Sequence, residues 1–229
     1  MTEANIRPNI AARRIGNEAQ PIAIIDGFHP DPDALRVHAA AAKFGPARNH
    51  YPGLRADLPL SYFADIRPGL AATLSGVFDH NGPLSLIDAS YAMVTTSPAE
   101  LTRVQRLPHV DAVDPQRIAL IHYLHPENLD GTAFYRHRAT GYETLDPTRA
   151  PTYLAALDAE RRSGAEPLPG YLTGSNAQYE QVTSVEARYN RAVLYRSALL
   201  HSGSITAAAV LSEDPALGRL TITAFLLLG

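Results

Sequence analysis

Three potential metal ligands that lie far apart in the sequence place the strongest constraint on the fold. His109 and Asp111 flank Val110, and His201 follows 92 residues after His109. In an extended segment, residues two apart point the same way, so His109 and Asp111 can reach one ion while Val110 points away. The fold must therefore bring a second strand, carrying His201, alongside the first.

Two histidines and one carboxylate occupy one face of an octahedral metal ion and leave three positions open, which is the ligand set of non-haem Fe(II) oxygenases. We therefore favour an enzyme that binds Fe(II) through His109, Asp111 and His201. Short His-x-Asp matches also arise by chance in a chain with nine histidines. The other match, His29–Asp31, stands where a strand runs into a helix N-terminus, and we interpret His29 as an exposed turn residue.

Composition limits the remaining classes of protein. With 45% hydrophobic and 19% charged residues, the chain is expected to be globular, and its 229 residues suit a single domain over 1–229 with a lead-in segment or early edge strand over 1–20. A net charge of −3 without a long basic run argues against nucleic acid as the main partner. Cysteine is absent, so any metal must be held by nitrogen and oxygen ligands.

Neither a membrane span nor a signal peptide is evident in the sequence. No long apolar run occurs, and the first residues, 1–7, lack an apolar core. The absence of cysteine agrees with a reducing compartment. We expect a soluble, cytoplasmic protein with no membrane partner.

Helices are expected early and strands late. The patterns predict a strand over 21–26, helices over 33–43 and 60–78, with an interruption near Pro68, and a further helix over 151–165. Segments rich in β-branched or aromatic residues predict strands over 84–95, 117–124, 131–138, 183–189, 191–195 and 219–227. An α+β, mainly β fold follows, with helices buttressing an antiparallel sheet that is closed or sandwiched.

The last of these strands alternates polar and apolar residues. Arg219, Thr221 and Thr223 share one face, which either is solvated or lines a cavity where a guanidinium can pair with a carboxylate. Likewise, His201 after two leucines is more often a hydrogen-bonded core residue than a ligand when considered alone. Only its partnership with His109 and Asp111 reverses that preference.

Five segments resemble the prolyl-hydroxylase-like branch of the 2-oxoglutarate- and Fe(II)-dependent dioxygenases. The similarity runs over about residues 105–227 and extends to a bacterial subgroup of that branch. The matching segments are Pro108–Asp111, Ala119–Tyr135, Asn190–Tyr195, Leu200–Gly203 and Gly218–Phe225.

This resemblance implies a double-stranded β-helix (jelly roll, cupin-like) buttressed by N-terminal helices. It implies that His109, Asp111 and His201 bind Fe(II), and that Arg219 binds the far carboxylate of the co-substrate 2-oxoglutarate. Tyr123 and Thr221 are candidates for the same carboxylate, although Tyr123 is equally well explained as a core tyrosine. Arg219 follows His201 by 18 residues, a longer gap than is usual in the superfamily, so Arg191 and Arg196 are kept as fallback anchors.

The implied reaction hydroxylates an unactivated C–H bond with O2 while 2-oxoglutarate is decarboxylated to succinate, with ascorbate as a supporting reductant. A carboxylate at Asp111 leaves no position for chloride, so hydroxylation or desaturation is expected in place of halogenation. The substrate is an amino acid, a peptide or protein side chain, or a small metabolite, and His50, Tyr51 and Arg55 are candidates for one wall of its site. Two alternatives stay open: a non-catalytic small-ligand binding protein, and a hydrolase or isomerase that uses the same triad as a Lewis-acid site.

Overall fold

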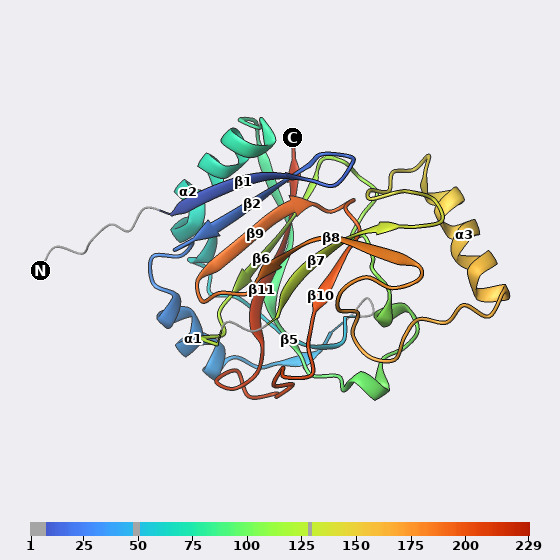
Figure 1. Ribbon diagram of the computed structural model, residues 1–229. Helices are drawn as coiled ribbons and strands as arrows, with labels where there is room; N and C mark the ends of the chain where they lie inside the picture. Colours follow the sequence, from blue (N-terminus) through green and yellow to red (C-terminus); the bar gives the residue numbers. More distant parts are fainter. Residues whose placement is uncertain (1–7, 48–50, 128–129) are drawn as a thin grey trace, which may run out of the picture.

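The chain folds as two antiparallel β-sheets with three α-helices on their outer faces (Figure 1). The computed structural model describes residues 8–47, 51–127 and 130–229. Within these ranges the large sheet has the strand order β1-β2-β9-β6-β11-β5-β4-β3, and the small sheet has the order β10-β7-β8. The expectation of a mainly β chain with helices is thus confirmed.

The elements of the described residues have the following bounds. The strands are β1 (Asn9–Ile15), β2 (Gln20–Asp26), β3 (Gly45–Pro46), β4 (Gly53–Ala56), β5 (Leu84–Val94), β6 (Arg117–Tyr123), β7 (Gly131–His137), β8 (Tyr179–Glu186), β9 (Arg191–Arg196), β10 (His201–Ser204) and β11 (Leu220–Leu228). The helices are α1 (Pro32–Ala41), α2 (Tyr62–Phe78) and α3 (Ala150–Arg162), with short 3₁₀ helices at Pro98–Glu100 and Val104–Arg106.

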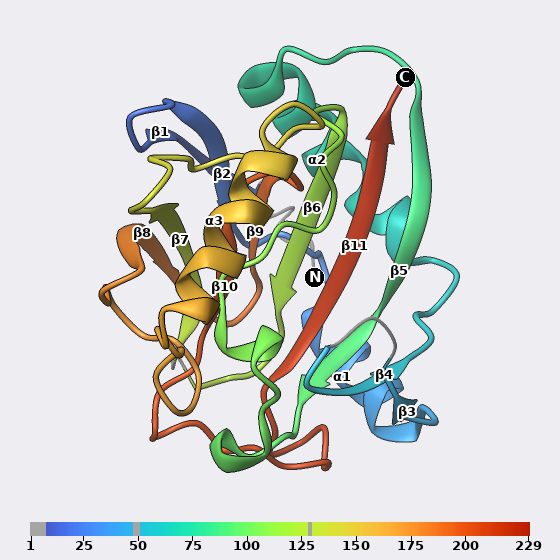
Figure 2. The same ribbon diagram turned by 90° about the vertical axis from the view of Figure 1, so that its right-hand side faces the viewer.

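The outer face of the large sheet packs against α1 and α2. Leu35 of α1 and Ile66 and Leu70 of α2 join one buried cluster with Leu120 and Ile222 of the sheet. The opposite face of the large sheet turns toward the small sheet, and Tyr195 and Phe134 meet there with ring centroids 5.1 Å apart. Figure 2 shows β6, β11 and β5 running side by side, to the right of α3 and β10 in this view.

Strand β11 illustrates how a period of two in the sequence assigns side chains to layers. Ile222 and Ala224 are fully buried on the helix side. Phe225 packs in the cluster between the sheets and is only partly buried, as is Thr223 two residues before it. The polar face predicted for this strand therefore faces the small sheet.

Helix α3 and the segments beside it cover the outer face of the small sheet. Tyr153 of α3 packs against Tyr179, and their hydroxyls lie 2.7 Å apart. Its place in a cluster of basic residues favours a solvated His137, but the residue is fully buried beneath this helix, with Nε2 3.1 Å from Glu160 and Nδ1 3.0 Å from Thr140. That expectation was wrong because the strand pattern alone did not reveal that a helix covers this face.

Two early segments differ from expectation, and in a third one of two alternatives is found. Helix α2 continues through Pro68, because the buried stripe that includes Ile66, Leu70 and Leu74 holds both sides of the proline against the sheet. The lead-in segment contains β1, an edge strand paired with β2, although residues 1–7 lie outside the described part. The sequence over 50–56 favours a loop, but this segment includes β4, and His50 lies outside the described residues. None of the described helices is long and apolar enough to cross a bilayer.

A buried polar network links β6 to the helices. The hydroxyl of Tyr62 lies 3.2 Å from Nδ1 of His122, and Nε2 of His122 lies 3.0 Å from Oδ1 of Asn190. The Asn190 amide also exchanges hydrogen bonds with the backbone of His29, at 2.9 Å each. His29 is therefore buried rather than an exposed turn residue. An amide oxygen only accepts, so Nε2 of His122 carries the proton and Nδ1 accepts from Tyr62.

This network predicts how stability depends on pH. Burial lowers the pKa of His122 to about 3, an effect that the bond to Asn190 opposes and the neighbouring His29 reinforces. In the unfolded chain this histidine is protonated as the pH falls below about 6.5, whereas in the folded chain it stays neutral. The free energy of unfolding therefore keeps its full value above that pH and decreases as the pH drops. We expect this group to contribute a slope of up to about 1.4 kcal/mol per pH unit between pH 7 and pH 5. Urea unfolding of the protein and of His122→Gln measures it, and equal slopes for both proteins would contradict the account.

Candidate metal centre

Backbone pairing brings the two candidate histidines together. The N–H of His109 donates to the carbonyl of His201 and the N–H of His201 donates to the carbonyl of His109, both at 2.9 Å. Residues that exchange both bonds in an antiparallel pair carry their side chains on the same face. Since His201 also pairs with Phe134, whose ring lies between the sheets, both imidazoles belong to the inner face of the small sheet.

Asp111 joins them from the same segment. Its N–H donates to the carbonyl of Ser197 at 2.9 Å, which continues the extended segment beside the turn before β10. Nε2 of His109 lies 3.8 Å from Oδ1 of Asp111, and Nε2 of His201 lies 3.6 Å from Oδ2. One ligand atom from each residue falls within 4.8 Å of the other two. The structure thus brings together the three residues that the sequence singled out.

The hydrogen bonds of His201 leave its inner nitrogen free. Nδ1 lies 2.9 Å from the carbonyl oxygen of Leu199, which can only accept, so Nδ1 carries the proton. Nε2 then has a lone pair and faces Asp111 at 3.6 Å. A backbone carbonyl that fixes the tautomer in this way is the usual support of a metal-binding histidine.

The carboxylate lacks the partners that a purely structural role requires. Oδ2 of Asp111 is buried without a hydrogen-bond partner among the described residues. An unpaired buried carboxylate oxygen is costly unless a cation or a donor completes it. Neighbouring ligand atoms of an octahedral ion with bonds of about 2.1 Å lie about 3 Å apart. The two nitrogen–oxygen distances here are 3.6 and 3.8 Å, so each would have to shorten by less than about 1 Å when the ion binds. The donor set therefore fits a divalent transition-metal ion.

Electrostatics keeps the imidazole of His109 in the form that binds metal. Although 56% of the His109 side chain is accessible, its inner edge lies against His201, with ring centroids 4.4 Å apart. Desolvation, and then the neighbouring His201, lower the pKa of His109 to about 4, while Asp111 opposes the shift. The ring is neutral at pH 7, as coordination requires. Tyr195 stacks edge-on against His201 at 4.7 Å, and burial, followed by the charge of Asp111, raises its pKa.

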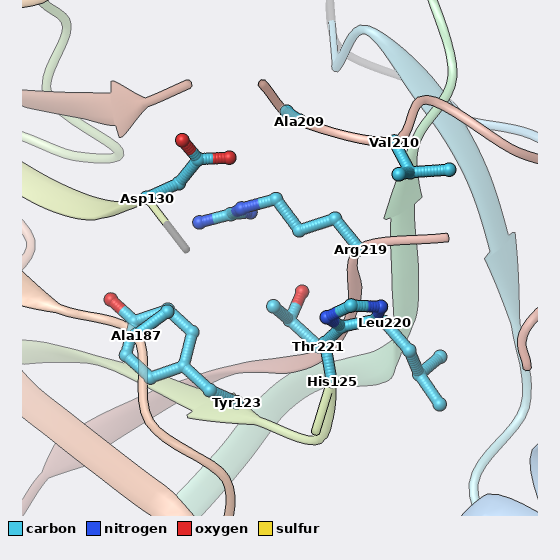
Figure 3. Close-up of a pocket in the computed structure, with 9 residues that line it drawn as sticks. All are labelled: Tyr123, His125, Asp130, Ala187, Ala209, Val210, Arg219, Leu220 and Thr221. Carbon is cyan, nitrogen blue, oxygen red and sulfur yellow. The ribbon is translucent and has the colours of Figure 1, made fainter. Parts of the chain in front are cut away.

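Arg219, Tyr123 and Thr221 line one small pocket, shown in Figure 3. Arg219 immediately precedes β11, and its guanidinium lies 5.8 Å from the ring of Tyr123. Nη2 donates to the carbonyl of Gly131 at 2.9 Å, while Nε is buried without a partner among the described residues. Asp130 faces the guanidinium across the pocket (Figure 3), but the two form no ion pair.

A chain of contacts connects this pocket to the histidines. The hydroxyl of Tyr123 lies 2.7 Å from that of Thr132, and Thr132 pairs with Gly203, two residues after His201 on β10. At about 3.3 Å per residue, Gly203 lies about 7 Å along the strand from His201. The pocket and the histidines are therefore connected through adjoining residues of β7 and β10.

The fallback anchors are engaged elsewhere. Arg191 forms a two-point ion pair with Asp26 at 2.6 and 2.8 Å, which leaves no fork for a ligand. Arg196 bonds the carbonyl of Pro115 and is directed to the other side of the strand, toward Phe78 of α2. Of the three arginines considered, Arg219 alone lies in the pocket with Tyr123 and Thr221.

Two supporting features were missed in the sequence. The Leu199 carbonyl that fixes the His201 tautomer carries no side-chain signal, since every residue has a carbonyl. Tyr195, which packs against His201, falls in a predicted strand but was not considered a site residue. The alternation of β9 would have placed it on the inner face.

The chain belongs to the Family of unknown function (DUF6445), whose model matches residues 6–226. A search of curated protein sequences finds no match. Among solved structures, the chain is similar to HygX from Streptomyces hygroscopicus with nickel, 2-oxoglutarate and hygromycin B bound (13% identity, 92% of this chain and 84% of that chain, TM-score 0.46). It is also similar to an N-substituted L-amino acid dioxygenase from Burkholderia ambifaria AMMD (13% identity, 96% and 95% covered, TM-score 0.47). Likeness at this level transfers no activity, so the function must be argued from the site itself.

The geometry predicts a single metal site that depends on Asp111. Replacing Asp111 by Ala removes one of the three ligands. Residues that only support a metal ligand typically change metal affinity by about 10- to 100-fold, so loss of a ligand itself should weaken Co(II) or Zn(II) binding by more than about 100-fold. Isothermal titration of the metal-free protein measures the affinity. Asp57→Ala, which removes an exposed carboxylate, is the matched control and should bind metal as the parent does. Unchanged binding by the Asp111 variant would exclude this site.

Proposed function

We propose that the protein is a non-haem Fe(II)- and 2-oxoglutarate-dependent dioxygenase of the prolyl-hydroxylase-like branch, acting as a hydroxylase. The observation that carries the proposal is the convergence of Nε2 of His109, Nε2 of His201 and the unpaired carboxylate of Asp111 on one point between two sheets. Fe(II) held there, with 2-oxoglutarate and O2, supplies the oxidation of an unactivated C–H bond coupled to release of succinate and CO2.

The strand order supports a double-stranded β-helix as the framework. From β5 onward the chain alternates between the two sheets, except at the β7-β8 hairpin. Strands β5, β6, β9 and β11 belong to the large sheet, while the His109 segment, the β7-β8 hairpin and β10 lie in the small sheet between them in sequence. Such winding sets the strand that bears His201 next to the segment that bears His109 and Asp111. The scaffold thereby places ligands of distant sequence position on one inner face.

The chain's own residues divide the work of binding. Arg219 offers a buried, unpaired Nε toward the far carboxylate of 2-oxoglutarate, and a guanidinium fork matches a planar carboxylate. Thr221 shares its pocket and directs its hydroxyl to the Ala92 carbonyl at 3.1 Å, while Tyr123 adds a second hydroxyl. His201 keeps its proton on Nδ1 through the bond to Leu199, so its orientation stays fixed while the co-substrate binds.

Two other classes remain to be separated from this proposal. A binding protein has no need for an accessible imidazole beside an unpaired carboxylate, and a Lewis-acid hydrolase has no need for a separate arginine pocket connected to the triad strand through Tyr123 and Thr132. Both features together favour the oxygenase.

The direct test is succinate production. Purified protein with Fe(II), ascorbate, O2 and 2-oxoglutarate should form succinate without added substrate, because such enzymes decarboxylate the keto acid slowly on their own. His109→Ala should reduce the rate to the level of protein-free Fe(II), whereas His38→Ala, which removes an exposed histidine of α1, should not change it. Succinate formation that survives in the His109 variant, or none in the parent protein, would refute the proposed activity.

A further inference from the structure

A second arginine without an acidic partner, Arg55 of β4, lies on the same face of the large sheet as Thr223. Its Nη1 donates to the hydroxyls of Ser90 and Thr223 at 2.8 and 2.7 Å, and its guanidinium carbon lies 4.6 Å from the centre of the Tyr51 ring. Among the described residues Arg55 forms no ion pair. A half-buried cation that is held by two hydroxyls and an aromatic ring is positioned but not neutralised.

The arrangement leaves the useful edge of the guanidinium unused. Both hydroxyl bonds fall on Nη1, so the parallel N–H groups of Nε and Nη2 have no partner in the described part of the chain. These two donors form the fork that matches a planar carboxylate in two-point contact. Ser90 and Thr223 keep that fork in one orientation, as a recognition site requires.

Apolar side chains lead from Arg55 toward the candidate metal centre. Sheet pairing sets Thr223 beside Ile121, and Phe225 beside Ala119, on the face between the sheets. Thr223, Ile121 and Phe225 are all partly accessible, whereas Ile222 and Ala224 on the helix side are fully buried. This strip therefore offers a partly exposed apolar surface on the inner side of the sheet.

The far end of the strip reaches the metal-ligand segment. Ala119 pairs with Tyr195, whose ring lies 4.7 Å from that of His201. The guanidinium of Arg117 stacks over Phe225 at 4.6 Å, and the backbone of Ser197 bonds both Arg117 and Asp111. Arg117 thus adds another cation that forms no ion pair within the described residues. Asp88, which pairs with Phe225 from the neighbouring strand, is an exposed carboxylate.

We propose that Arg55 binds a carboxylate of the substrate, whose apolar portion lies over Ile121 and Phe225 toward the triad. This inference rests on the proposed function and adds the substrate class: an organic acid with an apolar chain, either free or as the C-terminus of a peptide. Arg55 is distinct from Arg219, because it bonds Ser90 and Thr223 whereas Arg219 bonds Gly131. Both guanidiniums lie near the Tyr51 hydroxyl, and we assign Arg55 to a carboxylate of the substrate and Arg219 to the far carboxylate of 2-oxoglutarate.

Equilibrium binding to the full chain tests this assignment without turnover. Ligand-observed NMR, with and without Zn(II) and 2-oxoglutarate, compares butyrate, hexanoate and octanoate with the corresponding primary amides. Acetyl-alanyl-alanine and its C-terminal amide form a fourth pair, which distinguishes a peptide terminus from a free acid. We expect the acids of at least one pair to bind saturably. Their amides should bind at least about 10-fold more weakly, as expected for the loss of one charged hydrogen-bonded contact.

Three variants locate the binding. Arg55→Gln should weaken acid binding by about 10-fold or more and leave the affinity for 2-oxoglutarate within about twofold, while Arg219→Gln should do the reverse. Arg67→Gln, which removes an exposed arginine of α2, is the matched control and should change neither. If Arg55→Gln does not fold, Arg55→Lys retains the charge without the fork and should give the same selective loss.

Several results would overturn the inference. They are the absence of saturable binding by every acid, equal binding of acids and amides, or a loss of 2-oxoglutarate affinity in the Arg55 variant in place of acid affinity. If the parent protein binds the acids through Arg55 but does not bind 2-oxoglutarate, the assignment of Arg55 as a carboxylate site is supported and the proposed oxygenase function is refuted. The two proposals are therefore separated by one set of titrations.

Discussion

The pair of backbone hydrogen bonds between His109 and His201 is the contact on which the site depends. Each bond is 2.9 Å long, and together they join segments that lie 92 residues apart in the chain. Closing such a long loop carries an entropic cost that local interactions at the site cannot offset alone. The large sheet, with α1 and α2 packed on its outer face, supplies that stabilisation and leaves the inner face for polar residues.

The division of the large sheet into two faces also explains where function is placed. The helix side is closed by fully buried aliphatic residues, as in Ile222 and Ala224. The space between the sheets contains polar side chains with unused hydrogen-bonding capacity, among them Asp111, Arg55 and Arg219. A buried polar atom without a partner costs stability, so the unpaired Oδ2 of Asp111 and Nε of Arg219 point to ligands that complete them.

The sequence predicted the parts of this molecule that follow local periodicity. Strand β11 and its inward polar face could be anticipated because alternation at a period of two survives in any half-buried strand. The triad could be anticipated because the spacing of His109 and Asp111 has a direct geometric meaning. Pro68 within α2, buried His137 and buried His29 could not, because each depends on packing by elements distant in the sequence. Arg55 was noticed only as one wall of a site, since its hydroxyl partners come from β5 and β11.

The central claim is that one metal ion occupies the point where His109, Asp111 and His201 converge, with 2-oxoglutarate extending toward Arg219. The most direct measurement is anomalous X-ray diffraction at the iron absorption edge from crystals grown anaerobically with Fe(II) and 2-oxoglutarate. The account predicts one anomalous peak bounded by Nε2 of both histidines and the Asp111 carboxylate, with continuous density from it to the Arg219 guanidinium. A peak at other residues, or none at the triad under saturating Fe(II), would contradict it.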